Sequence, residues 1–96
     1  MVKFRTKKAL KIFKALANET RLKLLELIYE GETGMCDILP YIKKSQSLVS
    51  NQLSKLKSLD LIESRKEGKH VRFKIVDNDL KKILRIILEK DKNRRR

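Results

Sequence analysis

The sequence predicts a mainly α-helical domain with a small β-hairpin, an α+β fold in which four helices precede two strands and one helix follows them. Apolar residues recur at helical spacing in several stretches before Ser58 and again after Asp79. Between them the period changes from 3.6 to 2, and Glu67-Gly68 separates two strand-like segments, residues 61–66 and 70–76. With 96 residues, the chain is expected to form a single domain over residues 1–96.

The composition narrows the choice of partner. Hydrophobic residues make up 41% of the chain and aromatic residues only 5%, so we expect a core of Leu, Ile and Val. The net charge is +13, which favours a polyanion through phosphate neutralisation, with an anionic membrane surface as the competing partner. No apolar run approaches the roughly 20 residues that span a bilayer, and the N-terminus lacks a secretory signal. The single cysteine, Cys36, fits a reducing compartment, so we expect a cytoplasmic protein without a membrane partner.

The first two helices are expected at residues 2–17 and 19–29. In the first, six basic residues and no acid accompany an apolar stripe that includes Leu10 and Phe13. That stripe could lie on a membrane or pack on a partner helix, and packing is favoured because the stripe is modest and Trp is absent. Asn18 is expected to cap the second helix, with Glu19 in its first turn.

A short helix at residues 35–42 contains Pro40. If Asp37 caps this helix, Pro40 lies in the first turn and costs little. If the helix starts at Gly34, Pro40 should kink it, and the sequence leaves both alternatives open. Lys43 and Lys44 then form a turn into a further helix. A short helix, a tight turn and a helix with a polar outer face is the helix-turn-helix pattern.

Residues 45–62 are expected to form the helix around which the chain is organised. Val49, Leu53 and Leu56 share one side, and a row of Ser and Asn side chains occupies the opposite side with no acidic residue. Small polar groups can approach another surface closely. In a strongly basic protein that surface could be the major groove of DNA, and the alternative is a serine-rich surface helix without a partner.

The predicted hairpin and the last helix follow. In the second strand Val71, Phe73 and Ile75 share one face, and the opposite face and the tip are rich in Lys and Arg, so the hairpin is a basic wing. The last helix is expected over about residues 79–91, and either Asp77 or Asp79 could start it. It is so apolar that we expect it to bury itself against another subunit, with docking on its own domain as the alternative.

Three motifs resemble the ArsR/SmtB family of winged-helix repressors. ALANETRLKLL at residues 15–25 resembles the family signature ALxxxTRLxIL, and SQSLVSNQLSKL at residues 45–56 resembles its recognition helix, SQSTVSxHLxxL. Residues 65–73 look like its wing. The resemblance implies a winged helix-turn-helix fold and a homodimer held by the first and last helices, about residues 2–17 and 79–91. It also implies a near-palindromic operator with half-site centres roughly 34 Å apart.

These patterns predict the residues of each contact. Asn51 can pair with adenine, Leu48 either touches a thymine methyl or packs beside the turn, and Gln52 lies nearer the core edge. The residues expected at bases are Gln46, Ser47, Leu48, Ser50, Asn51 and Ser54. Those expected at phosphates are Lys43, Lys44, Lys55, Arg65, Lys66, Lys69, His70 and Arg72, with His70 otherwise a solvent-facing strand residue. Those expected in the dimer interface are Leu10, Phe13, Leu80, Ile83, Leu84 and Ile87.

No metal and no cofactor are expected. Many family members bind metal on the third helix through CxC followed by Asp, of which only Cys36-Asp37 remains here. Others bind zinc on the last helix through Asp and His, whereas here Asp77 and Asp79 have no following histidine. We expect Cys36 to be a buried structural residue, with a redox-sensitive thiol as the alternative.

The expected function is that of a sequence-specific DNA-binding transcriptional regulator, a repressor, that binds double-stranded DNA as a homodimer. The alternatives are a sequence-indifferent nucleic-acid-binding protein and a protein-interaction module that uses its last helix. An enzyme is not expected, because the sequence has no readable nucleophile–base pair and no phosphate-cradling glycine loop.

Overall fold

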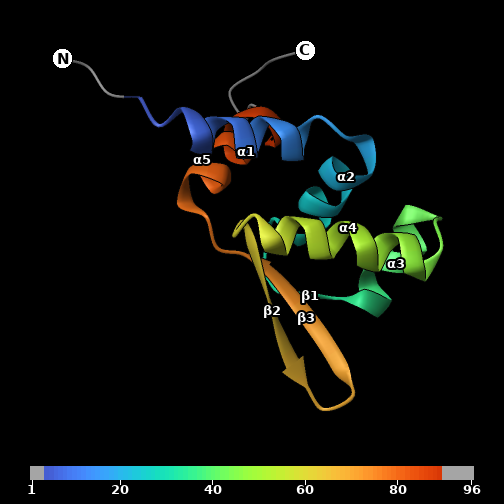
Figure 1. Ribbon diagram of the computed structural model, residues 1–96. Coiled ribbons are helices and arrows are strands. Elements are labelled where there is room, and N and C mark those ends of the chain that lie inside the picture. Colours follow the sequence, from blue (N-terminus) through green and yellow to red (C-terminus); the bar gives the residue numbers. More distant parts are fainter. Residues whose placement is uncertain (1–3, 90–96) are drawn as a thin grey trace.

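The computed structural model of the protein describes residues 4–89. The elements are α1 (Thr6–Leu16), α2 (Glu19–Ile28), β1 (Thr33–Gly34), α3 (Met35–Ile42), α4 (Gln46–Ser58), β2 (Ile62–Glu67), β3 (His70–Ile75) and α5 (Asn78–Leu88). Figure 1 shows α1 and α5 side by side at one end, α4 across the middle, and the β2–β3 hairpin extending away from the helices. The predicted winged helix-turn-helix order is confirmed, with one short strand added.

Three helices begin at residues whose side chains cap them. Asn18, Ser45 and Asp77 each accept a hydrogen bond from the backbone N–H three residues later, at 3.0, 3.1 and 2.9 Å. Short polar side chains at this position satisfy donors that the helix itself leaves free. The prediction for Asn18 is therefore confirmed, and the start of the last helix is decided in favour of Asp77 over Asp79.

The structure decides where α3 begins. The helix follows Gly34 directly, and the Gly34 N–H donates to Oδ2 of Asp37 at 3.3 Å. Pro40 is then the sixth residue of the helix, beyond the first turn, so the alternative with Asp37 as the cap is wrong. A proline there cannot donate to the carbonyl four residues earlier. The helix ends two residues later, where Lys43 takes the left-handed conformation with φ 59°.

The sheet has three strands, in the order β1–β3–β2, all antiparallel. β1 pairs Thr33 with Phe73, and a two-residue strand is too short to show alternation in a sequence. The predicted turn was wrong by one residue, because Glu67 still pairs with His70 and the turn is Gly68-Lys69. Gly68 has φ 64°, which a residue without a side chain adopts at no steric cost.

Several predicted helix limits need correction. The helix expected over residues 45–62 ends at Ser58, and the chain turns through Asp60, with φ 63°, before β2 begins. Within the described residues the first helix is Thr6–Leu16, shorter than the expected 2–17. The last helix runs from Asn78 to Leu88, and the expected residues 90 and 91 lie outside the described residues. None of the helices that the structure describes is long and apolar enough to cross a membrane.

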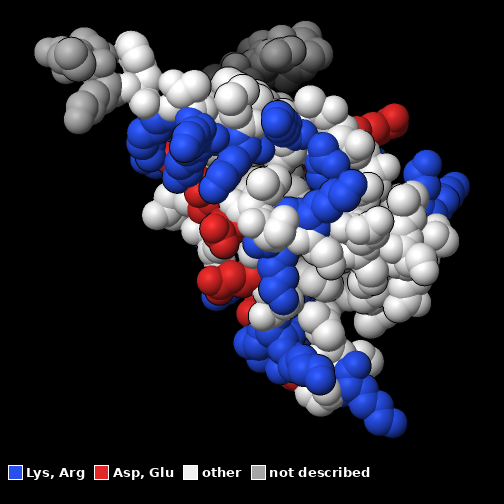
Figure 2. Space-filling model, in the orientation of Figure 1, with Lys and Arg blue, Asp and Glu red and all other residues white. Residues whose placement is uncertain are grey.

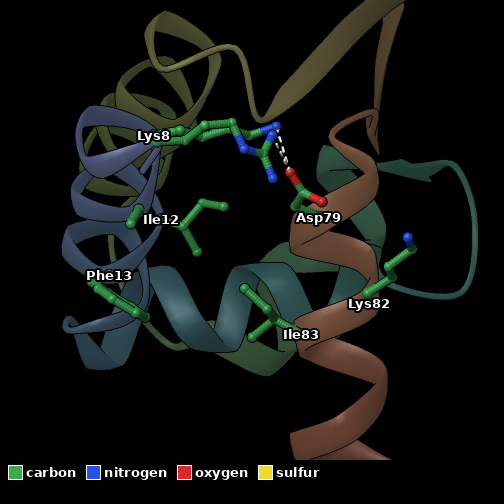
Figure 3. A pocket seen from close by; sticks show the side chains of 8 residues that line it. Lys8, Ile12, Phe13, Asp79, Lys82 and Ile83 are labelled. Atoms are coloured by element: carbon green, nitrogen blue, oxygen red, sulfur yellow. Dashed lines mark ion pairs between the residues drawn. The ribbon is translucent and has the colours of Figure 1, made fainter. Parts of the chain in front are cut away.

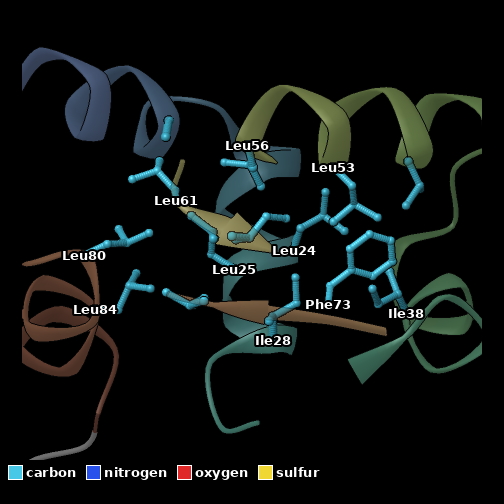
Figure 4. Close-up of a cluster of buried hydrophobic side chains, with 14 of the residues drawn as sticks. Leu24, Leu25, Ile28, Ile38, Leu53, Leu56, Leu61, Phe73, Leu80 and Leu84 are labelled. Carbon is cyan, nitrogen blue, oxygen red and sulfur yellow. The ribbon is translucent and has the colours of Figure 1, made fainter. Parts of the chain in front are cut away.

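The core draws on every helix and on the hairpin, as Figure 4 shows. Leu, Ile and Val dominate it as predicted, and Phe73 is the only aromatic residue among the buried ones in residues 4–89. On α4, Val49, Leu53 and Leu56 are at most 1% exposed. Because this side of α4 is anchored in the core, the opposite side must face solvent.

Candidate nucleic-acid interface

The outer face of α4 presents the residues predicted to meet bases. All six of them, Gln46, Ser47, Leu48, Ser50, Asn51 and Ser54, are exposed. All except Leu48 line one depression in the surface. No acidic residue occurs in α4, so this face combines hydrogen-bonding capacity with an absence of negative charge. A surface of that kind can approach the base edges of a duplex without electrostatic repulsion.

Leu48 and Gln52 lie beside this outward row of α4. Leu48 is 36% exposed, so it lies at the surface and is not packed into the core. Gln52 is half-buried and its Oε1 accepts a hydrogen bond from Nη1 of Arg21 at 3.1 Å. Gln52 therefore faces the body of the protein, as predicted. At the other end of α4, Lys57 Nζ donates to Oγ of Ser64 on β2 at 2.7 Å, which ties the helix to the wing.

Exposed lysines lie in the turn before α4, on α4 itself and on the hairpin. The predicted phosphate contacts Lys43, Lys44, Lys55, Lys66 and Lys69 are all exposed, and none makes an ion pair within residues 4–89. Figure 2 shows basic side chains spread over α1 and down to the wing, beside an area over α3 and α4 with few charges. His70 is also exposed, at the end of the hairpin.

The two wing arginines behave differently from the lysines. Arg65 makes a bidentate contact with Glu32, with Nη2 2.6 Å from Oε1 and Nε 3.1 Å from Oε2. Nε of Arg72 lies 2.8 Å from Oε1 of Glu67. The hydrogen bonds from Arg65 hold the pKa of the Glu32 carboxyl below its usual range. Sequence analysis missed Glu32 as a partner, because it lies 33 residues from Arg65 and the short strand that positions it is invisible in the sequence.

The apolar surface expected in a dimer interface is present only in part. Leu10, Phe13 and Ile87 are 51–61% exposed, and Ile86, which was not in the predicted set, is 76% exposed. Figure 3 shows Phe13 and Ile83 on the walls of a pocket of about 300 Å³ between α1 and α5.

Two residues of the predicted interface are wrong. Leu80 and Leu84 are 0% exposed in the core of the single chain and cannot meet a second copy. The face of α5 that carries Leu80, Leu84 and Leu88 packs on its own domain, and Ile86 and Ile87 leave apolar surface uncovered beside it.

A cluster of charges joins α1 to the start of α5. Nζ of Lys8 lies 2.8 Å from Oδ2 of Asp79, and Nη1 of Arg5 lies 3.1 Å from the same oxygen (Figure 3). Nζ of Lys8 also lies 3.0 Å from Oδ2 of Asp77. Hydrogen bonds to Asp79 and Asp77 raise the pKa of Lys8, and the bond from Lys8 lowers the pKa of Asp79. The two aspartates that the family resemblance associates with zinc are thus occupied by cationic side chains.

The remaining candidates for metal or redox chemistry are dispersed. Among residues 4–89, no three His, Cys, Asp or Glu side chains come close enough to hold a metal ion. Cys36 is exposed near the start of α3, so the expectation of a buried cysteine is wrong. Its redox role stays a prediction.

Comparison with known proteins identifies the family. The model of the bacterial regulatory proteins of the arsR family matches residues 18–64, from the α2 cap into β2. An uncharacterized HTH-type transcriptional regulator of Methanocaldococcus jannaschii is 39% identical over 83 residues, which cover 85% of this chain and 93% of that protein. The chain belongs to the ArsR family. It is a DNA-binding transcriptional regulator, and the family consists of regulators, not enzymes.

Solved structures agree with this ArsR-family assignment. HlyU from Vibrio cholerae superposes with a TM-score of 0.83 at 27% identity, covering 88% of this chain and 92% of HlyU. A homodimeric winged helix-turn-helix DNA-binding domain from Mycobacterium bovis gives 0.76 at 29% identity, covering 85% and 76%. The winged helix-turn-helix fold is therefore shared with DNA-binding proteins over most of the described chain.

Proposed function

We propose that two copies of the chain bind a near-palindromic operator in double-stranded DNA and repress transcription from it. The outer face of α4 carries this proposal, because it is exposed, polar and free of acidic residues while its inner face is anchored in the core. A helix held in this way can enter the major groove with little loss of conformational freedom.

Base readout is assigned to the outward row of α4. Asn51 is the residue with the geometry to pair bidentately with adenine, and Ser47 and Ser54 flank it on the same side. Gln46 and Ser50 line the same depression and are assigned to the edges of the contact. Leu48 is exposed beside them, which supports contact with a thymine methyl over packing beside the turn.

Phosphate contacts are assigned to the exposed cations on both sides of this row. Lys43 and Lys44 lie in the turn before α4, Lys55 lies on α4, and Lys66, Lys69 and His70 lie toward the end of the wing. Such contacts position the protein on the duplex and supply a salt-dependent affinity, but they carry no sequence information.

The dimer is assigned to the exposed apolar side chains of α1 and α5. These are Leu10, Phe13, Ile86 and Ile87, and the half-buried Ile83 lines one pocket together with Phe13. The homodimeric domain from Mycobacterium bovis supports this arrangement. Two copies then place their recognition helices in successive major grooves, with half-site centres roughly 34 Å apart. We assign residues 1–96 to one such domain and no metal or cofactor to it.

Repression would result from the dimer occupying the operator. A dimer that covers two successive major grooves excludes other proteins from the same stretch, so a promoter that overlaps the operator is blocked. Transcription in vitro from such a promoter should fall as the protein is added, and a rise would show activation.

Selection of binding sites from random DNA with the purified protein tests the whole proposal. We expect a palindromic consensus whose half-site centres are about 10–10.5 base pairs apart. Binding without any enrichment at physiological salt would show a sequence-indifferent nucleic-acid-binding protein. Enrichment of one isolated half-site would contradict the dimer.

A further inference from the structure

The outward face of the wing carries no net charge, although the protein as a whole is strongly basic. The register places Glu63 opposite Lys74, Arg65 opposite Arg72, and Glu67 opposite His70, so these six side chains share one face of the hairpin. Glu32 joins this face through its contact with Arg65. The three carboxylates of Glu32, Glu63 and Glu67 therefore balance the three cationic side chains of Arg65, Arg72 and Lys74.

The position of the Arg65 side chain explains how Glu32 contributes to this balance of charges. In the sheet, β3 lies between β2 and β1, and Glu32 immediately precedes β1. The Arg65 side chain therefore crosses over β3 to reach Glu32. Without the acids, Arg65 and Arg72 would be like charges directly opposite each other, which destabilises a strand pair. Both arginines lie along the wing in the free protein.

These pairs are exposed and therefore weak. The Arg65 side chain is 52% exposed and the Glu67 side chain 56%. Ion pairs in such positions contribute little, because water screens them. A DNA duplex offers a dense row of phosphates and releases counterions for each one that is neutralised. Phosphates are thus strong competitors for both guanidinium groups.

We propose that Arg65 and Arg72 change partners when the wing binds DNA. Each guanidinium group gives up its glutamate, Glu32 or Glu67, and binds a backbone phosphate instead. This inference rests on the proposed function, in which the wing lies against the duplex. Glu32 and Glu67 then act as counter-ions in the free protein that keep the paired arginines from adding to its positive charge. The wing contributes fewer cations before binding than during it.

Charge-neutral double variants test this exchange. The probe is a 30-base-pair duplex of mixed sequence, and its affinity is measured between about 50 and 200 mM salt, the range over which phosphate contacts dominate. E67Q/R72Q removes the Arg72–Glu67 pair and E32Q/R65Q removes the Arg65–Glu32 pair, and neither changes the net charge. Both variants also remove the longer contact between Nη1 of Arg65 and Oε2 of Glu67, at 3.9 Å. Each should lower the slope of log affinity against log salt by about 0.9, the value for one lost phosphate contact. Slopes equal to the wild type would show that the pairs persist on DNA and would overturn the exchange.

E30Q/K81Q is the matched control for the double variants. Glu30 and Lys81 are exposed and line one depression beside α5, and neither belongs to the hairpin or to an ion pair within residues 4–89. This variant should keep the wild-type slope. A slope that falls as much as in the wing variants would overturn the assignment to the arginines. Thermal unfolding by circular dichroism confirms that each variant is folded.

A single substitution tests whether Glu67 holds Arg72 away from DNA in the free protein. E67Q frees Arg72 and should raise affinity for the same duplex about 2- to 5-fold, the range of a weak ion pair. E63Q makes the same charge change on the same face, but Glu63 has no ion pair within residues 4–89, so its gain should be less than about 2-fold. Equal gains in affinity for E67Q and E63Q would contradict the proposal that Glu67 restrains Arg72. Failure of the wild type to bind any duplex would instead overturn the proposed function.

Discussion

Arg21 donates from Nη1 to Oε1 of Gln52 at 3.1 Å and thereby joins α2 to the recognition helix. The same guanidinium donates from Nη2 to the Lys14 carbonyl at 2.8 Å and from Nε to the Ala15 carbonyl at 3.3 Å. Those carbonyls belong to the last turn of α1, where a helix has acceptors without internal partners and favours a positive charge. One arginine thus connects the helix assigned to the dimer with the helix assigned to DNA.

Replacing Arg21 by Met keeps the aliphatic stem and removes all three hydrogen bonds. We expect a loss of about 1.5–3 kcal/mol in the free energy of unfolding, the range for hydrogen bonds from a charged group. Urea unfolding at fixed protein concentration measures the loss. DNA affinity should also fall, because α4 loses a positioning contact. Lys23→Met, on the exposed side of the same helix, is the control and should change neither quantity.

Substitutions at Asn51 and Lys69 separate base readout from phosphate contact. Asn51→Ala should cost about 1–3 kcal/mol on the selected operator and little on random DNA. Lys69→Ala should weaken both complexes and lower the salt slope by about 0.9. Fluorescence anisotropy on the two duplexes measures both effects. Equal losses of Asn51→Ala on both duplexes would exclude base readout by this residue.

Phe13 and Leu84 distinguish the interface from the core. Phe13→Asp places a charge on a side chain that is 61% exposed, so the chain should stay folded and sediment as a monomer. Leu84→Ala removes a fully buried side chain and should destabilise the fold by about 2–5 kcal/mol. Sedimentation velocity and urea unfolding measure the two outcomes. An unchanged dimer with Phe13→Asp would refute the assigned interface.

The Lys8–Asp79 pair predicts a dependence of stability on acid pH. Because the folded-state pKa of Asp79 is lowered, its carboxylate stabilises the fold above its ordinary pKa of 3.8. This contribution is lost as the pH falls through 3.8 toward the lowered value. The stability difference between wild type and Asp79→Asn should therefore be largest near neutral pH and shrink below pH 3.8.

Asp60→Asn is a suitable comparison for the acid experiment. Asp60 is exposed in the turn after α4 and makes no ion pair within residues 4–89. Asn tolerates its left-handed backbone conformation. Urea unfolding across pH 2–7 should show little difference between this variant and the wild type. If Asp79→Asn behaved in the same way, the Lys8–Asp79 pair would have no role in stability.

Zinc should not alter DNA binding. A tight zinc site requires about four nitrogen, sulfur or carboxylate ligands, and no group of three lies together in residues 4–89. Affinity for the selected operator should be the same with added Zn²⁺ and with a chelator. A zinc-dependent loss of affinity would point to ligands shared between two copies, and Cys36→Ser would test whether the exposed thiol is among them.

The order of helices and strands was predictable because it depends on local periodicity and capping chemistry. Val49, Leu53 and Leu56 recur at helical spacing, and each is buried in the structure. The outward row of α4 follows from the same spacing, so its exposure was predictable too. Sequence alone also determined the family, through motifs whose residues are adjacent along the chain.

The tertiary structure decided whatever depends on residues that are distant along the chain or on competition for one surface. Leu80 and Ile87 look alike in the pattern of α5, but the first is buried by its own domain and the second is left exposed. Arg65 appears as a free basic residue in the sequence, yet a two-residue strand brings Glu32 to it. Periodicity reports which side of an element is apolar or charged, whereas packing in three dimensions determines what meets that side.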